Sequence, residues 1–234
     1  VEDLLSHMPN ANNYNEMFDT SNALKEIIDK GYNLQMVGLL YGRVQSGKTI
    51  ASICFSALAA DNGYRNVIVL TSNVELLHIQ TMVDFKETLP WAAVLGEPKS
   101  STMVDYEHKI TNLSDDKMMI ITGKKNSKSL EMIERAFTST KRGILPTLII
   151  DDEGDQASLN IGTKKKTSEI YQSISNIRSS IGLHCFVTVT ATPFANLQLD
   201  SEKEKELYPE IIQSLPPGKG YTGADVFFNT HKND

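Results

Sequence analysis

The sequence predicts a three-layer α/β fold, in which a mainly parallel β-sheet is covered by helices on both faces. Between residues 35 and 200, short apolar segments alternate with longer amphipathic segments, as expected of repeated strand–helix units. Most of the short segments are apolar throughout, which is typical of strands that helices cover on both sides. One of them leads through a glycine-rich turn directly into a long helical segment, as a strand–turn–helix unit requires.

Strands are expected where short apolar runs are bounded by polar or turn residues, at 36–41, 66–70, 92–95, 118–122, 147–151 and 185–190. Helices are expected between them, at 47–61, 74–88, 102–112, 127–140 and 167–180. Residues 1–34 are predicted to form an N-terminal helical extension, with a helix at 22–30 that ends at Gly31. Residues 201–234 contain a Pro-Pro pair and several glycines, so we expect an extension or linker that leads out of the core.

Composition narrows the class of protein. A chain of 234 residues, 40% hydrophobic and 22% charged, is long enough for one large globular domain. The formal charge of −6 argues against a surface that binds nucleic acid everywhere, so any such contact must be local. Cys54 and Cys185 have no CxxC spacing, and no apolar run is long enough for a bilayer. We therefore expect a cytoplasmic protein with no membrane partner. Because it starts at Val1 without a Met, we also expect it to be part of a longer chain.

The glycine-rich turn carries the sequence GRVQSGKT at residues 42–49, between an apolar strand and a helix. Its glycines let successive backbone N–H groups point inward, next to the positive end of the helix, so that a polyphosphate such as that of ATP fits. Lys48 would reach the β and γ phosphates, and the Thr49 hydroxyl would coordinate Mg²⁺. A chance match in an ordinary glycine turn is the alternative. The predicted nucleotide-binding residues are Gly42, Gln45, Ser46, Gly47, Lys48 and Thr49.

A second motif, TLIIDDEGDQAS, delivers carboxylates from the end of a buried strand, where open α/β sheets place their ligands. Carboxylates this close together repel one another unless a cation offsets the charge, and Mg²⁺ held against phosphate does so. We predict that Asp152 binds the metal and that Glu153 orients and activates the attacking water. The alternative is a solvated acidic turn.

A third motif, FVTVTATPFANL, ends a strand with two hydroxyl residues before a proline. Beside the acidic turn, Thr190 and Thr192 could hydrogen-bond Asp155 and couple the nucleotide site to neighbouring elements. Taken alone, the motif is weak and favours a plain strand end. Its order after the other two motifs makes it specific.

These three motifs, in this order, resemble motifs I, II and III of superfamily 2 helicases, and imply the first RecA-like lobe of such an enzyme. More closely, GRVQSGKT, LIIDDEGDQAS, SEIYQSISNIR, VTATPFANL and LYPEIIQSLPPGKGYTGADVFF are similar to the Z-one domain family of proposed bacterial endonucleases. This resemblance implies a helicase-like ATPase of bacterial restriction or phage-defence systems, joined to or encoded beside DNA-cleaving or DNA-modifying components such as nucleases and methyltransferases.

Carried over to this sequence, the resemblance gives Lys48 and Thr49 for phosphate and metal, Asp152 and Glu153 for metal and water, and Thr190 and Thr192 for coupling. The acidic motif departs from many helicases by having Gly154 in place of Ala, which we expect to loosen the turn and leave the carboxylates in place. No sequence after Thr192 matches a second RecA-like lobe with an arginine finger, so we expect slow hydrolysis without that lobe. No separate nuclease cluster is evident either.

Two strand ends are candidates for contact with nucleic acid. Helicases of this class grip a strand after the second β-strand, where this sequence offers Thr71, Ser72, Asn73 and Gln80. Lys124, Lys125 and Asn126 follow another strand at the same edge and form a comparable candidate. The alternative for both groups is ordinary helix capping, for which Ser72 or Asn73 would serve in the first.

The leading hypothesis is an ATP-dependent motor domain that acts on DNA and uses Mg²⁺. A nucleotide-dependent switch or scaffold in a defence complex, without translocation, is the alternative. A small-molecule kinase is disfavoured, because an acidic turn followed by TATP is not a kinase arrangement.

Overall fold

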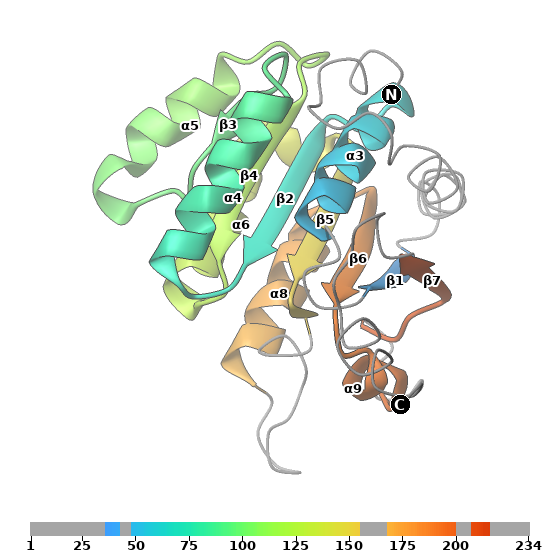
Figure 1. The fold of residues 1–234 in the computed structure, drawn as a ribbon. Helices are drawn as coiled ribbons and strands as arrows, with labels where there is room; N and C mark the ends of the chain where they lie inside the picture. The colour runs from blue at the N-terminus through green and yellow to red at the C-terminus, as the bar shows by residue number, and fades with distance from the viewer. Residues whose placement is uncertain (1–35, 43–47, 155–167, 200–206, 216–234) are drawn as a thin grey trace, which may run out of the picture.

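A seven-stranded β-sheet forms the centre of the protein (Figure 1). The computed structural model describes residues 36–42, 48–154, 168–199 and 207–215. Strands lie in the order β3-β4-β2-β5-β6-β1-β7, and every neighbouring pair is parallel. The strands are β1 (Val37–Gly42), β2 (Asn66–Thr71), β3 (Ala93–Leu95), β4 (Met119–Lys124), β5 (Thr147–Asp152), β6 (His184–Thr190) and β7 (Ile211–Leu215).

The helices fall between the strands, as the sequence predicts, and the bounds of the five expected helices differ from the predicted ones by at most two residues. They are α3 (Lys48–Asp61), α4 (Glu75–Thr88), α5 (Met103–Thr111), α6 (Ser127–Thr138), α8 (Glu169–Ser180) and α9 (Phe194–Leu197). Two short 3₁₀ helices, η2 (Ser100–Thr102) and η3 (Lys141–Ile144), and α9 were not expected. Within the described residues, no helix is both long and apolar enough to cross a membrane.

The buried side chains form one core on each face of the sheet. Because successive side chains of a strand point to opposite faces, Leu148 and Ile150 of β5 join one core while Ile149 joins the other. The first core is completed by α3 and α4, and the second by α5, α6 and α8. These two cores confirm the predicted three-layer fold, and they explain why the strand sequences are apolar throughout.

The sheet extends beyond the 35–200 lobe that the sequence predicts. Strand β7 pairs with β1, from Gly38 beside Ile211 to Gly42 beside Leu215, although the tail was expected to leave the core. The residues of β7 alternate between half-buried and exposed until the buried Leu215, as is typical of an edge strand. The expected helix at 22–30 lies outside the described residues.

All seven parallel strands end at one edge of the sheet, so the loops that follow them share one side of the protein. Strand register places Tyr41 beside Thr190, Val189 beside Asp152, and Leu70 beside Asp151. Three segments that are distant in sequence therefore meet at this edge. It is the edge at which open α/β sheets bind ligands.

Candidate functional site

The phosphate-loop residues that the structure describes lie at the junction of β1 and α3. Gly42 is the last residue of β1, whereas Lys48 and Thr49 are the first residues of α3. The first turn of α3 contains no acidic residue, so no carboxylate of its own offsets the positive end of this 14-residue helix. Gln45, Ser46 and Gly47 lie outside the described residues. The described part thus has the strand-to-helix geometry that phosphate binding requires.

Asp152, at the end of β5, shares this location with Lys48. Burial and the neighbouring charge of Glu153 raise the pKa of Asp152 to about 6, while the positive charges of Lys125 and, to a smaller extent, Lys48 act in the opposite direction. Lys48 begins α3 after β1, and Asp152 ends β5, so both lie at the carboxyl edge of the sheet. Strand β6 separates β1 from β5 in the sheet.

The residues present fit a magnesium ion that binds with a nucleotide. Burial makes the ionised form of Asp152 costly, and a cation would offset that cost. The described residues contain no group of three or more His, Cys, Asp or Glu that could hold a metal by themselves. Mg²⁺ takes few protein ligands and completes its coordination with waters and phosphate oxygens. Thr49 and Asp152 are the residues that would hold it.

The acidic turn contains a buried ion pair that the sequence did not reveal. The Lys125 ammonium lies 3.0 Å from Asp151 Oδ1, with side-chain exposures of 2% and 1%. It also donates to the backbone carbonyls of Asp152, at 2.5 Å, and Glu153, at 2.9 Å. The repulsion expected among these carboxylates is thus partly offset by a lysine of the protein itself.

Comparison with known proteins supports the architecture. No family model matches the sequence, and no curated protein is significantly similar to it. Among solved structures, the Hef helicase domain of Pyrococcus furiosus is similar at a TM-score of 0.55 and 16% identity, covering 82% of this chain and 37% of that one. The Aeropyrum pernix ORC2 protein follows at a TM-score of 0.45 and 14% identity, covering 89% of this chain and 48% of that one. This chain therefore spans well under two thirds of the length of either structure.

The chain has the RecA-like fold of P-loop NTPases. In this RecA-like lobe, the strand before the phosphate loop and the strand before the acidic turn flank β6. Thr190, at the end of β6, is fully buried between them, and its Oγ1 accepts a hydrogen bond of 3.0 Å from the Thr192 amide. Thr192 is exposed. Asp155, the predicted partner of both threonines, lies outside the described residues.

The turn after Asp152 has an unusual backbone. Glu153 has a φ of 55°, in the left-handed region that residues other than glycine seldom occupy. Gly154 follows in close contact with its surroundings, since a Cβ there would lie 2.4 Å from Thr188 Cγ2 and 2.7 Å from Asp151 Oδ2. The expectation that Gly154 merely loosens the turn is therefore wrong: the packing leaves no space for an alanine.

The candidates for nucleic-acid contact after β2 differ in accessibility. Thr71 is buried, and its hydroxyl lies 3.0 Å from His78 Nδ1. Asn73 and Gln80 are exposed. Helix α4 has Val74 as its N-cap and no side-chain capping bond, so neither Ser72 nor Asn73 caps it. Among the described residues, the buried Ser72 Oγ has no hydrogen-bond partner.

The two lysines after β4 have different surroundings. Lys125 is buried in the ion pair described above, so its ammonium does not face a surface to which nucleic acid could bind. Lys124 is more accessible, and it contacts Glu75 at 2.5 Å and Glu97 at 3.2 Å. The hydrogen bond with Glu75 raises the pKa of Lys124. The next residue, Asn126, does cap α6, because its side chain accepts a hydrogen bond from the Ser129 amide.

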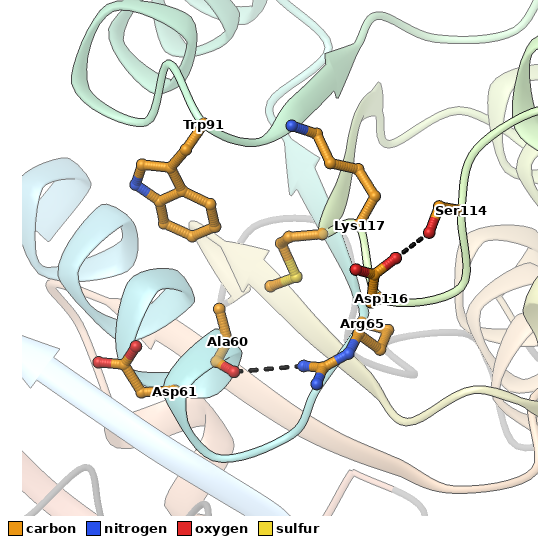
Figure 2. Close-up of a pocket in the computed structure, with 8 residues that line it drawn as sticks. Ala60, Asp61, Arg65, Trp91, Ser114, Asp116 and Lys117 are labelled. Carbon is orange, nitrogen blue, oxygen red and sulfur yellow. Dashed lines mark hydrogen bonds between the residues drawn. The ribbon is translucent and has the colours of Figure 1, made fainter.

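An open cleft of about 510 Å³ lies elsewhere (Figure 2). Its lining includes the end of α3 at Ala60 and Asp61, and Arg65 and Met118, which precede β2 and β4. The exposed Trp91 forms another wall. These residues lie at the amino ends of the strands, opposite the edge that carries Lys48 and Asp152. The cleft is therefore separate from the candidate site.

Proposed function

We propose that this protein is a nucleotide-binding ATPase lobe that uses ATP and Mg²⁺ to act on DNA. The observation that carries the proposal is that Lys48 and Asp152 lie at the same carboxyl edge of the sheet, after strands that only β6 separates. A lysine at the start of a helix and a carboxylate at the end of a buried strand are the two halves of an NTPase site. Similarity of fold to a helicase domain supports the same class.

Each residue has a distinct part in this proposal. The backbone amides from Gly42 to Thr49 bind phosphate oxygens together with the positive end of α3, and Lys48 adds a full charge near the γ phosphate. Mg²⁺, when bound, supplies positive charge against the phosphate oxygens. Glu153 holds the attacking water in line and accepts its proton. Thr190 and Thr192 couple the site to neighbouring elements, with Asp155 as their partner.

Contact with DNA is proposed at the ends of β2 and β4. The first turn of α4 presents backbone N–H groups without a side-chain cap, next to a Ser72 hydroxyl that has no described partner. Asn73 and Gln80 are exposed on the same segment, and Lys124 lies near it through its contact with Glu75. A local site of this kind is compatible with the net charge of −6.

The wider setting rests on the motif resemblance alone. We propose that the protein is cytoplasmic and bacterial, that a second RecA-like lobe completes the ATPase, and that nuclease or methyltransferase components act with it in restriction or phage defence. A switch that binds ATP to assemble such a complex, without translocating, is the competing proposal.

The test is the ATPase rate of the full-length protein with and without DNA. Lys48→Ala should abolish nucleotide binding, whereas Glu153→Gln should retain binding and lose turnover by about 10²-fold or more. Lys109→Met removes an exposed charge on α5 and serves as the matched control. DNA-stimulated turnover that both site variants lose supports the motor. Tight ATP binding without DNA-dependent turnover supports the switch, and no nucleotide binding contradicts both.

A further inference from the structure

We infer that Lys125 is a positioning residue: from inside the protein, it holds the backbone of the acidic turn so that the Glu153 carboxylate faces the nucleotide. The inference rests on the proposed catalytic role of Glu153. It also replaces the sequence-based expectation that Lys125 contacts nucleic acid.

The contacts of the Lys125 ammonium account for all of its hydrogen-bonding capacity. An ammonium has three donors, and its three acceptors here are Asp151 Oδ1 at 3.0 Å, the Asp152 carbonyl at 2.5 Å and the Glu153 carbonyl at 2.9 Å. Two of the three are backbone atoms of the residues assigned to metal and water. Lys125 thus fixes where the chain runs after β5, and the charge of Asp151 keeps the ammonium in place.

The other end of Lys125 is equally fixed. Its backbone N–H donates to the Thr71 carbonyl at 3.0 Å, directly after β4 and β2 end side by side. The side chain therefore extends from the end of β4, past the end of β2, to the acidic turn after β5. A side chain that is anchored at a strand end is positioned more precisely than one that is carried by a loop.

The backbone of Glu153 needs such support. A residue with a side chain persists at a φ of 55° only where its surroundings impose that conformation. Lys125 binds the Glu153 carbonyl, while Thr188 and Asp151 enclose the next residue, Gly154, from the other side. These contacts hold the backbone on both sides of the Glu153 side chain.

Stability alone does not explain why a charged pair occupies this position. A buried ion pair commonly contributes no more than an apolar pair of similar size, because both ions lose their hydration. An apolar pair would fill the space that these two side chains occupy but could not bind two carbonyl groups. Only the lysine can hold the two backbone carbonyls of the acidic turn, which points to a role in orienting Glu153.

The experiment replaces the ion pair without leaving a buried charge. Lys125→Met with Asp151→Val fills the same space with apolar side chains, whereas Lys125→Met alone would leave Asp151 unpaired and unfold the protein. In the full-length protein, the double variant should bind a fluorescent ATP analogue within about threefold of wild type, because the phosphate loop is untouched. Its kcat should fall about 10–100-fold, with KM little changed, because a displacement of about 1 Å has that effect on catalysis. Lys109→Met is the control.

A second readout does not depend on turnover. Amide hydrogen exchange of residues 151–154 should accelerate at least tenfold in the folded double variant and remain unchanged in the control. If the apolar pair does not fold, Lys125→Gln with Asp151→Asn provides a neutral polar pair for the same comparison.

The outcomes separate this inference from the proposed function. If wild type hydrolyses ATP and the folded double variant keeps its kcat, Lys125 is only structural and the inference is overturned, whatever the exchange rates show. If wild type does not hydrolyse ATP, the proposed function fails. In that case, the amide exchange rates of residues 151–154 decide whether Lys125 holds the turn. Unchanged rates in the double variant would show that it does not.

Discussion

Gly154→Ala tests the packing of the acidic turn. The added Cβ would lie 2.4 Å from Thr188 Cγ2 and 2.7 Å from Asp151 Oδ2. Carbon atoms in favourable contact are about 3.5–4.0 Å apart, so the methyl group overlaps Thr188 by about 1 Å. Strand β6 is fully buried and cannot move aside, and overpacking of this kind costs about 1–3 kcal/mol of the free energy of unfolding.

Urea unfolding of the protein and thermal unfolding provide the assays. At this chain length, each kcal/mol lowers Tm by about 2–4 °C. Gly182→Ala is the matched control, because its Cβ would meet only the Gly143 carbonyl, at 4.0 Å, and we expect no more than about 0.5 kcal/mol.

A double variant identifies the clash. Thr188→Ser removes the overlapping methyl group, so Gly154→Ala should cost at least about 1 kcal/mol less in a Thr188→Ser background than in wild type. Asp151 Oδ2 still limits the space, so the rescue should be partial. Equal costs in the two backgrounds, or a Gly154→Ala variant as stable as Gly182→Ala, would refute the reasoning.

Three further predictions concern charge. The pKa of Asp152 is raised from 3.8 to about 6, so the protein takes up a proton on folding and its free energy of unfolding falls as the pH rises through that range. In urea unfolding, Asp152→Asn should remove this fall and increase the free energy of unfolding by about 2–3 kcal/mol at pH 7. Burial and the Arg178 charge lower the pKa of His184 from 6.5 to about 4, so stability should decline as the pH drops through that range, and a His184→Gln variant with an unchanged pH profile would contradict this. Lys124→Met should weaken DNA binding and reduce its salt slope by about one, with little change in Tm; an unaltered slope argues against contact there.

The fold was predictable where burial alone determines the sequence. Strands such as β2 and β5 lie between two layers of helices, and their continuous apolar runs, NVIVLT and TLII, follow directly from that position. Strand β7 was missed because an edge strand needs only part of its side chains buried, so IIQSL lacks the same signal.

The candidate site was predictable only as far as local motifs extend. Lys48 and Asp152 could be predicted to lie at one edge of the sheet because each stands in a recognisable strand context, and the fold places both at that edge. Two adjacent lysines, in contrast, look alike in sequence. Successive side chains at a strand end point to opposite sides, so Lys124 reaches surface carboxylates while Lys125 turns inward to Asp151. Which of the two lysines is buried depends on Asp151, which lies on β5, and the sequence around the lysines does not predict this contact.

The position of β6 has a consequence for the size of the site. Neighbouring strands are about 4.8 Å apart, so β1 and β5, with β6 between them, are separated by about 10 Å at the edge where they end. The segments that follow β1 and β5 therefore start about two strand spacings apart, and the end of β6, with the buried Thr190, lies between them. In the proposed site, Lys48 and Asp152 would thus approach a ligand from two sides, and the order of the strands sets their separation.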